Sequence, residues 1–283
     1  LTLCDQPYIE TVQVAPRIAS SDILIQTRIA NRGTTAVAFA LEQHVRTWKQ
    51  AEEVAAMRLP RLMLKPGEER IWMQTVRIPK QKLWSPESPF LYVLETSTGG
   101  DSVSTRFGMR EFRFDTPTRR AYLNGKVYFM RGSNITLHRF FEDPLCRSHP
   151  WEERWVRKLL AEVPKRMSWN SFRFSIGPVP DQWLDIADEV GLLIENEFFI
   201  WGYSKKWSTA EMIRQFGEWM RDNWNHASVV IWDACNETTS DVLVREVIPA
   251  VRKLDLSSRA WECSYNPPQD ADDPVEDHPY LFH

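Results

Sequence analysis

Asn236 and Glu237 form an adjacent amide–carboxyl pair, and they follow an apolar run at residues 229–232 after only three further positions. A carboxyl group placed at the end of a buried strand can donate a proton to a leaving oxygen and later take one from water. An isolated Asn-Glu pair more often only caps the next helix. The pair therefore indicates either proton-transfer chemistry or helix capping. The choice between the two depends on the predicted strands and helices around the pair.

From about residue 113, short apolar strands alternate with helical stripes. One stripe is Trp151, Trp155, Leu159 and Val163, at helical spacing. The candidate strands cover residues 128–131, 171–174, 192–194, 229–232, 260–263 and 279–282. This alternation predicts parallel strands, and residues 113–283 fit about six units of an eight-unit (β/α)₈ barrel. Catalytic groups of such barrels lie at the C-terminal ends of the strands, which is where Glu237 falls.

The first part of the chain has a different pattern. Residues 23–29, 71–78 and 91–96 are rich in β-formers and partly alternate between apolar and polar, with turn residues such as 65–68 between them. Short strands at regular spacing are typical of a β-sandwich, which we expect over residues 8–112.

Composition limits the classes of partner. The formal net charge is −3, so no basic face for nucleic acid is expected, and no apolar run is long enough to cross a membrane. The four cysteines form no CxxC pair, so we expect buried free thiols. An acidic tail, comprising Asp270, Asp272, Asp273, Glu276 and Asp277, is expected to be a solvated loop, with a Ca²⁺ or Mg²⁺ site as the alternative. The 13 Trp suit either a core or stacking on sugars.

The chain starts without Met and without the features of a signal peptide. We therefore expect a piece of a longer protein. The compartment stays open, with a periplasmic or secreted location favoured over the cytoplasm if the source is bacterial. A homo-oligomer is likewise left open.

Several stretches resemble glycoside hydrolase family 2, in the family's order. Residues 83–92, LWSPESPFLY, are similar to the family's "LWSPENPYLY". Residues 222–237 resemble its "NHPSV", strand and "NE", with Ala227 in place of the Pro. Residues 183–193 resemble "WYDLCDEYGLLV". The resemblance implies an immunoglobulin-like β-sandwich followed by a partial (β/α)₈ TIM barrel, with the family's N-terminal sugar-binding-like domain left out.

The resemblance also implies roles for individual residues in a retaining β-glycosidase that acts on carbohydrate without a metal or an organic cofactor. Glu237 matches the general acid/base, and Asn236 matches the residue that binds the sugar 2-hydroxyl. Arg173 matches an Arg that pairs with the nucleophilic carboxylate, a task that suits a planar bidentate donor. Tyr280 matches a Tyr that touches the nucleophile, and His278 competes for that alignment.

The family's nucleophilic Glu ends the seventh strand. Three β-α-β units of about 30 residues beyond Glu237 would overshoot His283, so we expect the nucleophile beyond residue 283 and an inactive fragment. Glu262, on the fifth strand, is expected to line the barrel.

The sequence departs from the family where specificity is decided. Residues 175–178 lack the His of the family's "SHYP", and His138 is displaced from the family's other His. We therefore do not expect the sugar pocket of a standard β-galactosidase. His138, Arg139 and Trp201 could supply replacement contacts, or they could be packing residues.

Two other interpretations remain open. The chain could be a non-catalytic carbohydrate-binding or scaffold protein with a decayed glycosidase fold, although such a protein has no need of an acid/base. It could also be another (β/α)₈ glycosidase, such as a family 5 cellulase, whose strands can also end in Asn-Glu. The predicted sandwich upstream argues against the second.

Overall fold

A computed structural model describes residues 4–276 and 278. The chain divides into two compact units. Unit 1 runs to Trp84 and includes Phe90–Arg110. Unit 2 comprises Ser85–Pro89 and the chain from Glu111 onward. Each helix of the described residues is too short or too polar to span a bilayer.

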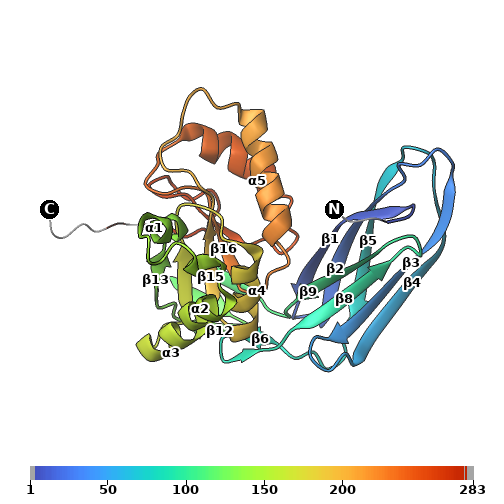
Figure 1. Cartoon of the computed structure of the whole chain (residues 1–283), viewed down its shortest axis with the longest axis horizontal. Coiled ribbons are helices and arrows are strands. Elements are labelled where there is room, and N and C mark those ends of the chain that lie inside the picture. Colours follow the sequence, from blue (N-terminus) through green and yellow to red (C-terminus); the bar gives the residue numbers. More distant parts are fainter. Residues whose placement is uncertain (1–3, 277, 279–283) are drawn as a thin grey trace. The chain divides into compact units, whose positions relative to one another are not determined.

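Unit 1 is a sandwich of two antiparallel sheets (Figure 1). One sheet has the order β1-β2-β5, and the other has the order β4-β3-β8-β9. Alternate residues of β2, among them Ile23, Ile25 and Ile29, are fully buried, as expected for strands with one face on a core. The predicted sandwich is confirmed. Its strands are β1 (Tyr8–Arg17), β2 (Asp22–Ala30), β3 (Val37–Thr47), β4 (Glu53–Leu64), β5 (Glu69–Arg77), β8 (Tyr92–Ser97) and β9 (Ser102–Phe107).

Unit 2 begins with a small antiparallel sheet, β10 (Phe112–Asp115), β11 (Arg120–Leu123) and β12 (Lys126–Tyr128). The prediction of a barrel strand at residues 128–131 is wrong. Asn124 and Gly125 both have positive φ and turn the chain between β11 and β12, so Tyr128 pairs antiparallel with Ala121. The short strands β6 (Trp84–Ser85) and β7 (Ser88–Pro89) lie where the two units meet in the sequence.

The main sheet of unit 2 is parallel, and its strands follow one another in sequence order. Its strands are β13 (Gly132–Ile135), β14 (Ser171–Phe174), β15 (Leu193–Glu197), β16 (Val229–Asp233) and β17 (Ala260–Glu262). An α/β unit with parallel strands is thus confirmed. The sixth predicted strand, at residues 279–282, lies outside the described residues.

Helices connect these strands (Figure 1). They are α1 (Leu137–Glu142), the 3₁₀ turn η1 (His149–Trp151), α2 (Glu153–Arg157), η2 (Lys158–Glu162), α3 (Val163–Met167), α4 (Asp181–Val190), α5 (Thr209–Asn223), η3 (Leu243–Val247) and α6 (Ile248–Arg252). Two of them, η2 and η3, are π-helical, and each lies just before a proline, Pro164 or Pro249. A proline cannot donate the regular i→i−4 hydrogen bond, which favours such local widening.

The tryptophans and cysteines divide between core and surface. Trp183, Trp232 and Trp261 belong to the buried core of unit 2, whereas Trp201 is 55% exposed. Cys235 and Cys263 are buried free thiols, as predicted. Cys4 is exposed and Cys146 only half-buried, because both lie outside the two cores, so the prediction was wrong for them.

Candidate active site

Glu237 lies just beyond β16, at the C-terminal edge of the parallel sheet. The segment after β16 runs beside the segment after β15, because Asn236 N–H donates to the carbonyl of Ile200 at 2.8 Å and pairs with Trp201 in a parallel bridge. On the other side, Ala234 N–H donates to the carbonyl of Glu262 at 2.9 Å. Asn236 is buried, and the Glu237 side chain is 22% exposed. A backbone held on both sides thus presents a carboxyl group that water or a ligand can reach.

The start of β16 is fixed as firmly as its end. The buried carboxylate of Asp188, on α4, accepts hydrogen bonds from Ser228 N–H at 2.7 Å and lies 2.8 Å from His226 Nδ1. Burial acts to raise the pKa of Asp188, but the charge and hydrogen bonds of His226 and Ser228 outweigh it and lower the pKa. Asp188 therefore joins α4 to the turn that leads into β16.

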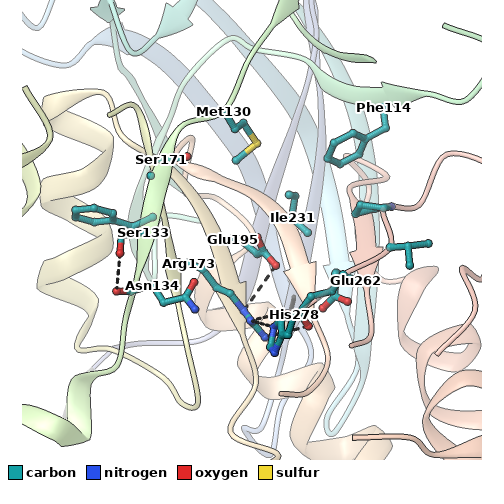
Figure 2. A pocket seen from close by; sticks show the side chains of 15 residues that line it. Phe114, Met130, Ser133, Asn134, Ser171, Arg173, Glu195, Ile231, Glu262 and His278 are labelled. Atoms are coloured by element: carbon teal, nitrogen blue, oxygen red, sulfur yellow. Dashed lines mark hydrogen bonds and ion pairs between the residues drawn. The ribbon is translucent and has the colours of Figure 1, made fainter. Parts of the chain in front are cut away.

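Arg173, on β14, lies at the centre of a polar cluster (Figure 2). Its Nε donates to Asp233 Oδ2 at 2.8 Å and lies 3.1 Å from Glu197 Oε2. Its Nη2 lies 3.4 Å from Asn236 Oδ1, and its Nη1 donates to Glu276. Burial acts to lower the pKa of Arg173, and the surrounding carboxylates, Asp233 first, outweigh this and raise it. The guanidinium stays charged and ties Asn236 to the sheet.

His278 bridges two carboxyl groups. Its Nδ1 lies 3.0 Å from Glu237 Oε1, and its Nε2 contacts Glu276. Tyr265 approaches the same two residues, with its hydroxyl 3.5 Å from Glu237 Oε1 and 3.3 Å from His278 Nδ1. Burial acts to lower the pKa of His278, but its hydrogen bonds with Glu237 and Glu276 outweigh burial and raise it. Two side chains that can exchange protons, His278 and Tyr265, therefore lie beside Glu237.

Four acidic side chains gather near Arg173, namely Glu195, Glu197, Asp233 and Glu262. Three of them, all except the partly exposed Glu195, are almost fully buried. Burial raises the pKa of each of the four, and the charge of Asp233 raises that of its three neighbours further. A cavity of about 500 Å³ opens beside them, lined in part by Arg173, Glu195, Glu262 and His278 (Figure 2).

Backbone strain gathers at the same edge. Ile176, Glu237 and Ser264 follow β14, β16 and β17, and each has a φ between 42° and 57°. This left-handed region is unfavourable for residues with a side chain, above all for a β-branched one such as Ile176. Such strain is often found at functional sites.

The predicted site residues are brought together in part. Asn236, Glu237, Arg173 and His278 form one hydrogen-bonded group. Trp201 joins it through its backbone, while its indole is exposed. His138, on α1, makes no hydrogen bond or ion pair with Glu237, Asn236 or Arg173 within residues 4–276 and 278. Tyr280 lies outside the described residues.

The acidic tail is a solvated loop only in part. Asp270 and Asp272 are exposed, as predicted. Asp273 is buried, because its carboxylate accepts from Trp261 N–H at 2.9 Å and from Arg252 Nη1 at 3.1 Å. These bonds hold the segment that carries Glu276 against the barrel strands. Asp277 lies outside the described residues.

The sequence analysis did not place five other members of the cluster at the site, namely Asp233, Glu195, Glu197, Tyr265 and Glu276. A signal was available for three of them. Glu195 and Glu197 are two positions apart on one strand and so share a face, and Asp233 ends an otherwise apolar strand. Tyr265 and Glu276 lie in a long loop after β17, where spacing predicts nothing.

Fold and site together define an α/β barrel unit with a strand-end Asn-Glu pair. Two family models match the chain, "Glycosyl hydrolases family 2" over residues 7–110 and "Glycosyl hydrolases family 2, TIM barrel domain" over residues 119–277. The chain belongs to glycosyl hydrolases family 2.

The curated relatives are longer than this chain. A protein named "Putative beta-glucuronidase" from Formosa agariphila is 31% identical over 207 residues, which are 68% of this chain and 19% of the relative. The "Beta-galactosidase BoGH2A" of Bacteroides ovatus is 29% identical over 187 residues, 60% of this chain and 21% of that protein. The chain thus spans about a fifth of the length of these relatives.

Solved structures share the fold. A glycosyl hydrolase family 2 member from Bacteroides cellulosilyticus superposes with a TM-score of 0.76 at 22% identity, covering 94% of this chain and 36% of that one. A β-galacturonidase from Eisenbergiella tayi bound to galacturonate gives a TM-score of 0.74 at 21% identity, covering 92% of this chain and 46% of that one.

Proposed function

We propose that this chain is part of a retaining β-glycosidase that hydrolyses terminal β-O-glycosidic bonds, with Glu237 as the general acid/base. The observation that carries the proposal is the placement of Glu237. It is a reachable carboxyl group at the C-terminal edge of a parallel sheet, on a strained residue, beside the buried pair Asn236 and Arg173. Barrel enzymes carry their catalytic groups at this edge, and a glycosidase needs a carboxylic acid to protonate the leaving oxygen.

Asn236 and Arg173 have supporting roles in this proposal. Asn236 supplies an amide to the sugar 2-hydroxyl, a contact that strengthens as the sugar ring gains positive charge. Arg173 orients the second carboxylate, which attacks the anomeric carbon. Its guanidinium has fixed neighbours in Asp233 and Glu197, and its Nη1 and Nη2 face Glu276.

The second carboxylate is proposed to come from beyond residue 283. A retaining mechanism requires two carboxyl groups about 5–5.5 Å apart, one as nucleophile and one as acid and then base. Glu262 is only 3% exposed and is paired with Asp233 in the register of β16 and β17, so it is not assigned the role of nucleophile. The 283-residue chain alone is therefore expected to be inactive, and turnover by it that Glu262→Gln abolishes would contradict this assignment.

The substrate is proposed to be a carbohydrate with a terminal β-linked sugar. The relatives carry the names β-glucuronidase and β-galactosidase, and one structural neighbour is a β-galacturonidase. A panel of nitrophenyl β-glycosides of these sugars therefore tests the substrate class directly.

The deciding experiment uses the longest form of the protein that contains these residues. Glu237→Gln should lower kcat/KM by about 10²–10⁴-fold, with the smallest loss on aryl glycosides whose leaving group needs no proton. Glu246→Gln is the matched control, because Glu246 is an exposed carboxyl group on η3. Equal activity of the two variants would overturn the role of Glu237. Sugar binding without turnover by the unaltered protein would favour a carbohydrate-binding protein instead.

A further inference from the structure

Three acidic residues form a row across the parallel sheet. Glu197 pairs with Asp233 in the register of β15 and β16, and Asp233 pairs with Glu262 in the register of β16 and β17. Neighbouring strands are about 4.8 Å apart, and paired residues of a parallel sheet point to the same face. All three residues are at most 3% exposed. The register therefore forces three buried carboxyl groups against one another.

The positive charge near this row is too small for all of them to be ionised. The Nε atom of Arg173 lies 2.8 Å from Asp233, 3.1 Å from Glu197 and 3.8 Å from Glu195, and its Nη1 pairs with Glu276. One guanidinium thus faces four carboxyl groups, and Glu262 is not among them. Like charges at such distances in a buried site cannot all ionise, so some of the groups must keep a proton.

Glu262 is the group with the least support for a negative charge. Both of its oxygens are buried, and neither accepts a hydrogen bond from a donor in the part of the chain that the structure describes. Asp233, in contrast, accepts from Arg173 Nε and from Cys235 N–H. Glu197 has its ion pair with Arg173.

The groups that face Glu262 reinforce this difference. Asp233 from β16, Glu195 from β15 and Glu276 from the loop after β17 all raise the pKa of Glu262, and burial raises it most. The facing cation, Arg173, belongs to β14 and bonds to Asp233, and His278 bonds to Glu276 and Glu237.

We propose that Glu262 is kept as an uncharged carboxylic acid that donates a hydrogen bond to Asp233, and that this acid–carboxylate pair positions Arg173 beside Asn236. Glu262 is thus a positioning residue. It pairs with Asp233 in the register, with a carboxyl oxygen within 4.8 Å of one of Asp233; Asp233 holds Nε of Arg173, and the other end of Arg173 reaches Asn236. The positioning half of the proposal rests on the proposed function, whereas the protonation half does not.

A metal ion is the competing way to neutralise the row. Carboxylate oxygens of Glu195, Asp233 and Glu262 lie within 4.8 Å of one another, a spacing that a cation could bridge. The guanidinium of Arg173 already contacts two of these three groups, Asp233 and Glu195. A second full cation beside it would be repelled, so a shared proton is the better solution.

Infrared spectroscopy of the 283-residue chain at neutral pH tests the protonation. The carbonyl stretch of a protonated carboxylic acid is separate from that of a carboxylate, and it shifts in D₂O. Glu262→Gln should remove one such band, and Glu246→Gln should leave it unchanged. An unaltered spectrum in Glu262→Gln would overturn the proposal. So would loss of the band when Mg²⁺ or Ca²⁺ is added to the unaltered chain, because a metal ion would then be the neutralising group.

Folding is informative as well. An amide at position 262 still donates to Asp233, so Glu262→Gln should fold, and a failure to fold would contradict the proposed hydrogen bond.

Glu262→Ala leaves Asp233 without that donor. In the longest form of the protein, Glu262→Gln should keep kcat close to that of the unaltered protein, and Glu262→Ala should lower it by up to about a hundredfold through misplacement of Arg173. Equal kcat values in the two variants would remove the positioning role. Absence of any glycosidase activity would contradict the proposed function but would not affect the protonation of Glu262 that infrared spectroscopy tests.

Discussion

Arg173 donates its Nε hydrogen bond to Asp233 at 2.8 Å, although the two residues lie 60 positions apart and belong to strands that are not neighbours. The strand between them, β15, contributes Glu197 to the same guanidinium. One cation therefore connects β14, β15 and β16 on the inner face of the sheet. The same side chain joins three strands of unit 2 and belongs to the proposed catalytic site.

Replacing Arg173 should destabilise the protein strongly. Arg173→Met leaves buried carboxylates without their counter-charge, which should cost about 3–5 kcal/mol of unfolding free energy. Arg245→Met is the control, since Arg245 pairs with Asp241 on the surface and should change stability by no more than about 0.5 kcal/mol. Urea unfolding of the 283-residue chain, followed by tryptophan fluorescence, measures both. Equal stabilities would show that the cluster needs no cation.

Stability should fall as the pH rises through the neutral range. Burial and the charge of Asp233 raise the pKa of Glu195 to about 8 and that of Glu197 to about 9. The folded state therefore keeps protons that the unfolded chain releases above about pH 4.3, and stability falls as the pH increases between these values. Urea unfolding at about pH 5 and about pH 8 should give the higher free energy at pH 5, and Glu197→Gln should reduce the difference. A higher free energy at pH 8 would contradict the assigned protonation.

Asp188 should have the opposite effect on the pH dependence of stability: its stabilising contribution should be lost as the pH falls into the acidic range. Its pKa is lowered in the folded state, so its contribution to stability is present above its ordinary pKa of about 3.9 and is lost as the pH falls below that value. Asp188→Asn should lower stability at neutral pH and flatten the loss on acidification. Asp241→Asn, at an exposed carboxylate, should retain the acid dependence. The same acid dependence in both variants would show that Asp188 carries no such role.

Gly132 should be irreplaceable in the first barrel strand. A Cβ built on it would lie 1.7 Å from the backbone oxygen of Ser171, so Gly132→Ala must push β13 away from β14, at a cost of about 3 kcal/mol. Gly217, within α5, has its nearest neighbour, Leu254 Cδ1, at 3.4 Å. Gly217→Ala should therefore be neutral or up to about 1 kcal/mol more stable. Thermal or urea unfolding compares the two, and similar stabilities would mean that the contact between the strands can yield.

The sequence predicted those elements whose apolar pattern is strong. The strands β2, β5 and β8 of unit 1 and the apolar strands β14 to β17 were predicted because burial selects the residue types, whereas β1, β3 and β9 of unit 1 were not predicted. The strand β13 was missed because its residues, Gly132 to Ile135, are mostly polar and largely exposed. The apolar residues just before it were a better match to a strand, and the Asn124-Gly125 turn that draws Tyr128 into a hairpin was overlooked.

The candidate site was predictable for those polar residues that lie within or directly after a buried strand. Asn236 and Glu237 follow a strand of five buried residues, and Arg173 lies within another buried strand. The acidic row beside them could not be predicted, because buried carboxyl groups contradict the usual rule that acidic residues lie at the surface. Only the register of β15, β16 and β17 reveals that Glu197, Asp233 and Glu262 meet.

The bond between Asp188 and Ser228 has a consequence for how far this protein can change. It fixes one end of the segment that runs to Asn236, and the bond from Asn236 to Ile200 fixes the other. Because both ends are anchored, the number of residues between them determines which face of the sheet each side chain occupies. Inserting or deleting a single residue would turn Asp233 from the inner face to the outer one and carry Glu237 away from the edge. Substitutions along this stretch are therefore open to evolution and to design, whereas its length is not.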